Sequence, residues 1–138
     1  MTGKYLLDKS ALARMIHAPV RRRLAPIIES GEAASCAIVD LEVLFSARTY
    51  EDYVDTRRRR DLAYHRIPLK DETFQRALDV QQALAKIGQH RLPIPDLIVS
   101  ATAELASLTV LHYDSDFDTI ARITGQPMEW VVERGSVP

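Results

Sequence analysis

A chain of 138 residues with 46% apolar and 27% charged side chains is large enough to bury one core, so a single domain over residues 1–138 is expected. The formal net charge of −1 decides nothing about nucleic acid, because the segregation of charges matters more than their sum. One cysteine, Cys36, excludes an internal disulfide framework, and we expect a cytoplasmic protein with no signal peptide and no membrane span.

Runs of strand-forming residues alternate with helical repeats along the chain. The expected strands, in chain order, cover residues 4–7, 33–38, 65–69, 109–112 and 128–132. The expected helices cover residues 10–16, 19–30, 39–45, 50–63, 71–87, 96–107 and 115–124, and the tail from Glu133 is expected to fray. Strands that alternate with helices predict a parallel sheet covered on both faces, with right-handed crossovers.

Four acidic residues fall at one edge of this predicted sheet. Asp8 and Asp114 end strands, and Glu42 lies early in the helix that follows the second strand. Asp96 starts the helix that leads into the fourth strand, so it also lies at the carboxyl edge, where ligand sites of open α/β sheets occur. No two of the four are within one helical turn in sequence, so only the fold could gather them.

Carboxylates gathered in one cleft repel one another, and a divalent cation relieves that repulsion. Oxygen ligands favour hard ions such as Mg²⁺ or Mn²⁺ over zinc. A water on such an ion can become a nucleophile, and the helix N-termini near Asp96 and Asp116 favour a phosphate. The pattern therefore predicts metal-assisted phosphodiester hydrolysis without a side-chain nucleophile.

Each acid also has a simpler interpretation. Asp8 and Asp96 could be helix N-caps, because aspartate is common at that position. Asp116 could be a cap or a group that supports the site without touching the metal. Asp40 is expected to cap the helix that carries Glu42, and Glu42 itself could be a surface glutamate.

Two basic runs contrast with the acidic stretches. The run between Asp55 and Asp61 is either a solvated helix face or a contact to RNA phosphates, and residues 21–23 allow the same two interpretations. The candidate RNA-binding residues are Arg57, Arg58, Arg59 and Arg60.

Other residues near the acids have structural interpretations. Ser10 is either a group that supports Asp8 or a helix-start hydroxyl. His112 ends a strand and is expected to be a satisfied structural histidine. Phe117 and Trp130 are expected in the core, and Cys36 is expected to be inert.

Four stretches together resemble the PIN-domain proteins of the VapC toxin family. They are residues 5–10 (YLLDKS), 40–43 (DLEV), 94–101 (IPDLIVSA) and 112–117 (HYDSDF). The resemblance covers almost the whole chain in order and spacing, and the four acidic positions together are specific. Many family members have Thr or Ser where this chain has His112.

The resemblance implies a three-layer α/β/α PIN fold with a five-stranded parallel sheet in the order 3-2-1-4-5. It also implies an Mg²⁺-dependent endoribonuclease, with Mn²⁺ as a substitute. The implied catalytic residues are Asp8, Glu42, Asp96 and Asp114, and the implied metal ligands are Asp8, Asp96, Asp114 and Asp116.

The family further implies a homodimer and a VapB-type antitoxin that fills the acidic cleft with a basic side chain. Its RNA targets include transfer RNA and ribosomal RNA. On this interpretation the chain is the toxin of a type II toxin–antitoxin pair.

Three rival hypotheses remain open. A non-catalytic PIN-like module would bind RNA or protein, with its acids as helix caps and no affinity for a divalent ion. A non-toxic RNA-processing nuclease would use the same chemistry. A receiver-type domain needs a lysine after a late strand, and no lysine follows Asp116.

Overall fold

Five parallel strands form one sheet in the order β3-β2-β1-β4-β5, which confirms the predicted topology. The structure, a computed structural model, describes residues 4–138, so the first three residues of the expected domain lie outside the described residues. The strands are β1 (Tyr5–Leu7), β2 (Ala33–Ser35), β3 (His65–Arg66), β4 (Thr109–His112) and β5 (Met128–Trp130).

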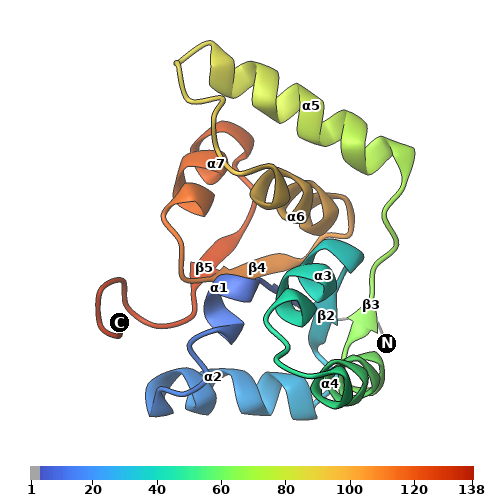
Figure 1. Cartoon of the computed structure of the whole chain (residues 1–138). Coiled ribbons are helices and arrows are strands. Elements are labelled where there is room, and N and C mark those ends of the chain that lie inside the picture. Colours follow the sequence, from blue (N-terminus) through green and yellow to red (C-terminus); the bar gives the residue numbers. More distant parts are fainter. Residues whose placement is uncertain (1–3) are drawn as a thin grey trace.

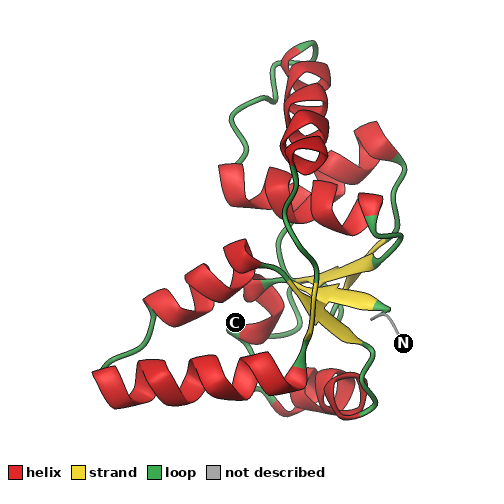
Figure 2. Ribbon diagram, turned by 90° about the vertical axis from the view of Figure 1, so that its right-hand side faces the viewer, coloured by secondary structure: helices red, strands yellow, loops and turns green. Residues whose placement is uncertain are grey.

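Helices cover both faces of this sheet, as the α/β/α prediction requires (Figures 1 and 2). They are α1 (Lys9–Leu12), α2 (Ala18–Glu29), α3 (Ala37–Phe45), α4 (Tyr50–Ala63), α5 (Asp71–Ala85), α6 (Ile94–Leu105) and α7 (Asp116–Thr124). One core cluster joins the sheet to α3, α5, α6 and α7, and a second joins its other face to α1 and α2. Among residues 4–138, every helix is too short or too polar to cross a bilayer.

The strands supply both cores because successive side chains point to opposite faces. In β1, Leu6 belongs to the first cluster and Leu7 to the second. In β4, Val110 and Leu111 divide in the same way. Strands buried on both faces read as short continuous apolar runs, which is the pattern that identified them in the sequence.

Several element boundaries differ from the sequence-based prediction. Helix α1 ends at Leu12 rather than at residue 16, and Ile16 is 79% exposed. The second strand stops at Ser35 because Cys36 is the N-cap of α3, so the apolar residues after it lie in a helix. Short buried runs are ambiguous between strand and helix, which explains this error. The third strand likewise covers two residues instead of the expected range 65–69.

Helix α6 begins two residues earlier than predicted. Pro93 is its N-cap, and Pro95 lies in its first turn, where a missing N–H removes no helical hydrogen bond. Both prolines therefore belong to the start of the helix.

The end of the chain is docked rather than frayed. The hydroxyl of Tyr113 donates to the carbonyl oxygen of Val137 at 2.7 Å, and the N–H of Val137 donates to that hydroxyl at 3.2 Å. The Arg14 Nε also donates to the oxygen of Pro138 at 3.1 Å. These bonds attach the tail to the elements that follow β1 and β4, so the prediction of fraying is wrong for this segment.

Candidate metal centre

The two central strands deliver two aspartates to the same edge of the sheet. Strands β1 and β4 pair directly, with Leu7 opposite Leu111. Asp8 follows β1, and its N–H donates to the carbonyl oxygen of Leu111 at 2.9 Å. Asp114 lies two residues beyond the end of β4. The carboxyl edge predicted from the sequence is therefore where the acidic residues begin to gather.

Three carboxylates form a cluster at this edge. Asp96, Asp114 and Asp116 each offer one oxygen, and the three oxygens lie within 4.8 Å of one another. Asp96 lies in the first turn of α6 and is buried, whereas Asp114 and Asp116 are half-buried. The N–H of Asp116 donates to Asp114 Oδ1 at 2.9 Å, so Asp116 opens α7 without capping it.

Asp8 and Glu42 adjoin this cluster, and their pKa values respond to the charges of neighbouring acids. The pKa of Asp8 is raised by burial and, to a smaller extent, by the charge of Asp114. Burial and then the charge of Asp8 raise the pKa of the half-buried Glu42, while Lys9 opposes the shift. The fold has therefore brought together the acidic positions that the sequence predicts at one edge.

Asp96 shows the strongest perturbation. Its pKa is raised to about 8, first by burial and then by the other acids, in the order Asp8, Asp114, Asp116 and Glu42. Burial, followed by the charge of Asp114, also raises the pKa of Asp116. Such repulsion between buried carboxylates is what a bound cation relieves.

Two buried carboxylate oxygens have no hydrogen-bond partner among the described residues. They are Oδ1 of Asp8 and Oδ2 of Asp96. A buried oxygen that accepts nothing is costly unless a cation or another partner compensates it. This donor set is made of oxygen alone and fits a hard divalent ion.

The helix-cap interpretation is confirmed for Asp8 and wrong for Asp96. Asp8 is the N-cap of α1, and its Oδ2 accepts from the Ser10 N–H at 2.9 Å. That bond leaves Asp8 Oδ1 free, so capping and metal binding are compatible. The N-cap of α6 is Pro93, and Asp96 has no capping role there.

Ser10 links the two strand ends. Its Oγ accepts from the Tyr113 N–H at 2.9 Å, while its own N–H holds Asp8. The residue therefore connects the start of α1 to the loop that carries Asp114. Of the two interpretations of Ser10, these bonds favour a group that supports Asp8 over a hydroxyl that only starts the helix.

His112 lies beneath the loop with its ring buried. Its Nδ1 accepts from the Asp114 N–H at 3.2 Å, and its ring centroid lies 5.0 Å from those of Phe117 and Trp130. Burial lowers the pKa of His112 to about 4, so the ring is neutral at neutral pH. The prediction of a satisfied structural histidine holds for Nδ1 only, because Nε2 is buried and finds no hydrogen-bond partner among residues 4–138.

The other structural expectations hold in part. Phe117 is fully buried, whereas Trp130 is only half-buried and donates from Nε1 to Asp118 at 3.2 Å. Cys36 is buried, and burial raises the pKa of its thiol, which disfavours the reactive thiolate.

Asp40 holds a buried ion-pair network and does not cap α3. Its Oδ1 accepts from Arg60 Nε at 3.1 Å and Nη2 at 2.9 Å, and from Ser35 Oγ at 2.8 Å. Its Oδ2 accepts from Arg66 Nη2 at 2.5 Å. Arg60 is only 9% exposed, so the prediction that Arg60 contacts RNA is wrong: it joins α4 to α3 instead.

The other three arginines of that run behave differently from one another. Arg58 and Arg59 are exposed and form ion pairs with Asp55 at 2.6 Å and 3.1 Å. Arg57 has no carboxylate within 4.0 Å in the described part of the chain and lines a pocket between α3 and α4. The structure therefore divides the predicted basic cluster, and none of it belongs to the acidic cluster.

Replacing Arg60 by methionine should destabilise the fold. The buried charge of Asp40 would lose two of its hydrogen bonds, and breaking a buried pair from one side costs about 3 kcal/mol or more. The free energy of unfolding measured in urea should fall accordingly. Arg59→Met, which breaks an exposed pair, should change it by less than about 1 kcal/mol. Equal effects of the two variants would contradict a structural role for Arg60.

Known proteins resemble this chain at the level of both sequence and fold. The family model described as the PIN domain matches residues 5–123. Two Mycobacterium tuberculosis proteins named Ribonuclease VapC21 and Ribonuclease VapC51 are 49% and 41% identical to it, and each comparison covers 99% of both chains.

Two solved structures extend the likeness to the fold. DNA-bound VapBC from Salmonella typhimurium has a TM-score of 0.77 at 16% identity, covering 95% of this chain and 100% of that chain. VapBC2 from Rickettsia felis, bound to a DNA fragment from its promoter, has a TM-score of 0.74 at 14% identity, covering 91% and 96%.

Proposed function

We propose that the chain is a metal-dependent endoribonuclease. The premise is that the chain belongs to the PIN-domain family and, within it, to the VapC ribonucleases. The observation that carries this proposal is the three-carboxylate cluster together with the adjoining Asp8, because Asp8 and Asp96 each keep a buried carboxylate oxygen without a partner among residues 4–138. The curated relatives are named ribonucleases, which supports RNA as the substrate.

The family resemblance assigns a role to each acid. By that pattern Asp8, Asp96 and Asp114 hold the principal ion, which we assign as Mg²⁺, with Mn²⁺ as a substitute, and the Asp116 oxygen lies within 4.8 Å of those of Asp96 and Asp114. When bound, the ion supplies positive charge to the reacting phosphate and lowers the pKa of a bound water. Glu42 lies at the rim with a raised pKa and completes the ligand shell or orients the attacking water. Asp116 supports a second ion or steadies the first.

Ser10 supports the metal centre through two hydrogen bonds to the segments that carry its ligands. It holds the Asp8 carboxylate through its N–H and the loop of Asp114 through its hydroxyl. Holding both loops fixes the spacing of ligands that come from two different strands, which is the kind of support that tunes a metal site.

The biological role follows from the family and from the complexes that resemble this fold. We propose that the chain is the toxin of a type II pair, a single PIN domain that forms a homodimer and is inhibited by a VapB-type antitoxin. The similar solved structures are VapBC complexes, in agreement with such a partner. A basic side chain of the antitoxin suits the cleft, because it would compensate the same unpaired oxygens as the metal.

The proposal predicts cleavage of RNA by the purified protein that requires Mg²⁺ or Mn²⁺ and stops in excess chelator. Attack by a metal-activated water leaves 5′-phosphate and 3′-hydroxyl ends. The measurement is incubation with total bacterial RNA, followed by gel analysis and enzymatic mapping of the fragment ends. Cyclic 2′,3′-phosphate ends would contradict it, because they mean that the ribose hydroxyl attacked.

A further inference from the structure

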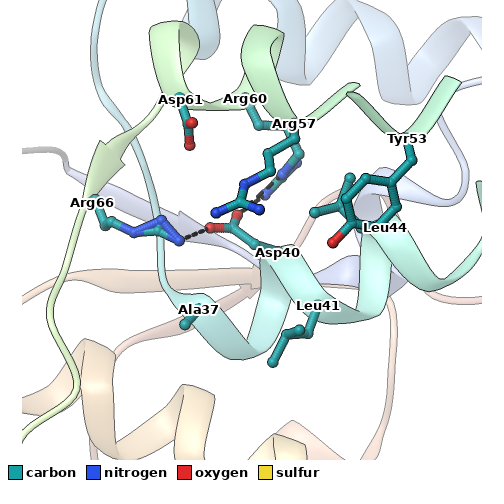
Figure 3. A pocket seen from close by; sticks show the side chains of 9 residues that line it. All are labelled: Ala37, Asp40, Leu41, Leu44, Tyr53, Arg57, Arg60, Asp61 and Arg66. Atoms are coloured by element: carbon teal, nitrogen blue, oxygen red, sulfur yellow. Dashed lines mark hydrogen bonds and ion pairs between the residues drawn. The ribbon is translucent and has the colours of Figure 1, made fainter. Parts of the chain in front are cut away.

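A pocket of about 210 Å³ lies between α3 and α4 (Figure 3). None of its lining residues belongs to the three-carboxylate cluster. Arg57 reaches into it from α4, and Arg66 enters from the opposite side, at the end of β3. Asp40 forms its floor, and Leu41, Leu44 and Tyr53 give it an apolar wall. The metal centre described above uses none of these residues.

The charges around this pocket favour an anion. Asp40 is already shared by Arg60 and Arg66, so one carboxylate faces two guanidinium groups. Arg57 adds a third, with no ion pair in the described part of the chain, and Asp61 offsets only one charge. Arg66 keeps donors for a ligand, because its side chain remains 53% exposed. Guanidinium groups of this kind bind phosphate with paired hydrogen bonds.

The pocket adjoins the metal centre through α3. Asp40 and Glu42 are two residues apart on this helix, about 3 Å along its axis, yet Asp40 faces the pocket while Glu42 faces the acids. An anionic polymer that reaches an acidic centre needs positive charge beside it. The pocket supplies that charge on the opposite face of α3 from the acids.

The size of the pocket indicates what fills it. Pockets that enclose a whole drug-sized ligand usually measure about 300–1,000 Å³, so this one suits a single unit of a longer chain. A cationic side for phosphate and an apolar wall for the attached sugar and base match one nucleotide of RNA, since bases stack on aromatic rings such as that of Tyr53.

We infer that this pocket binds a backbone phosphate of the RNA on the opposite side of α3 from the metal centre, with Arg57 and Arg66 as the two sides of the pocket. Arg60 does not touch the phosphate. It neutralises and holds Asp40, so that the carboxylate positions Arg66 instead of repelling the ligand. The inference rests on the proposed RNA cleavage, and it adds a residue, Arg66, that the basic run in the sequence does not contain.

The test compares the Arg57→Gln, Arg66→Gln double variant with Arg59→Gln, which removes the same type of charge from the same helix but lies outside the pocket. Binding of a fluorescein-labelled, mixed-sequence, single-stranded RNA is measured by anisotropy in Mg²⁺, with Asp96→Asn in every chain so that RNA stays intact. The double variant should weaken binding about tenfold or more. Its salt dependence should also fall, by about 0.7 in log–log slope for each phosphate that the protein no longer neutralises. Arg59→Gln should do neither.

Cleavage kinetics provide the second readout in proteins that keep Asp96. The double variant should raise KM with kcat little changed, because the pocket holds substrate away from the reacting atoms. The single variant Arg57→Gln is the control for misfolding, because Arg57 has no ion pair to lose within residues 4–138.

Three outcomes would overturn the inference. An equal loss of RNA affinity in Arg59→Gln would mean that the effect comes from the total charge of α4 rather than from the pocket. Unchanged RNA binding in the double variant would exclude the pocket, and unchanged RNA binding with weakened binding of a VapB-type protein would assign it to a protein partner. Failure of the unmodified protein to cleave RNA would overturn the proposed function instead, while the binding experiment would still decide on the pocket.

Discussion

Asn in place of Asp96 is expected to lower metal-dependent RNA cleavage by at least about 100-fold. Removing a residue that only supports a metal ligand already costs about 10–100-fold, and Asp96 is placed to be a ligand itself. Burial and the charges of the other four acids all raise the pKa of its carboxyl group. The measurement is the initial rate of RNA cleavage in Mg²⁺, with Asp79→Asn, an exposed aspartate of α5, as the matched control.

The same variant separates a catalytic defect from a folding defect. The pKa of Asp96 is about 8, so without metal the folded protein holds this group mostly protonated at neutral pH, and asparagine resembles that neutral form. The melting temperature in chelator should therefore be unchanged or higher, while the increase that Mg²⁺ produces in the unmodified protein should be lost. A lower melting temperature in chelator would assign Asp96 a structural role. Equal cleavage by Asp96→Asn would place the nuclease activity elsewhere or in a contaminant.

The sequence predicts the candidate site better than the boundaries of the elements around it. Asp8 and Asp114 follow short apolar runs, and that local signal places them at strand ends without knowledge of packing. The strand order came from the family resemblance, and it is what makes β1 and β4 neighbours. Helix α1 was predicted too long because the apolar Met15 and Ile16 continue a helical spacing that the backbone leaves after Leu12.

The ion pairs could not be predicted, because they depend on contacts between distant segments. Asp40 and Arg60 are twenty residues apart, and only the packing of α3 against α4 joins them. One signal was present: Arg60 continues the inward-facing spacing of Tyr53, Thr56 and Ala63 along α4, whereas its neighbours in the arginine run do not. Arg66 gave no signal, because it is one basic residue at the end of a two-residue strand.

These unpredicted pairs change the interpretation of the basic run. A count of four consecutive arginines suggests one patch for phosphates. In the fold, two of them pair with Asp55, one is buried against Asp40, and Arg57 alone of the four has no ion pair within the described residues. Burial and pairing, rather than the number of charges, decide which residue of such a run is available to RNA.

The stability of the metal-free protein should fall as pH rises from about 6.5 to about 8, whereas below about pH 6.5 the low pKa of buried His112, about 4, opposes this dependence. The pKa of Asp96 is about 8 in the folded protein and near its ordinary value of 3.8 in the unfolded chain. In that window the folded state binds more protons than the unfolded state, so the free energy of unfolding decreases with pH, at most by about 1.4 kcal/mol per pH unit for this group. Asp8, Glu42 and Asp116 act in the same direction because their pKa values are also raised. Urea unfolding in chelator at several pH values measures this slope, and stability that rises over the window would contradict it.

Metal binding should show the opposite dependence on pH. An ion bound by Asp96 must displace its proton, so below pH 8 the affinity for Mg²⁺ should rise with pH, by up to about tenfold per pH unit for each proton released. Calorimetric titration of Mg²⁺ in two buffers of different ionisation enthalpy counts the protons released. In a separate measurement, the Mg²⁺-induced rise in melting temperature should be larger at pH 8 than at pH 6. In Asp96→Asn this proton release should disappear. Binding without proton release at pH 6 in the unmodified protein would mean that the ion is held by groups other than the buried acids.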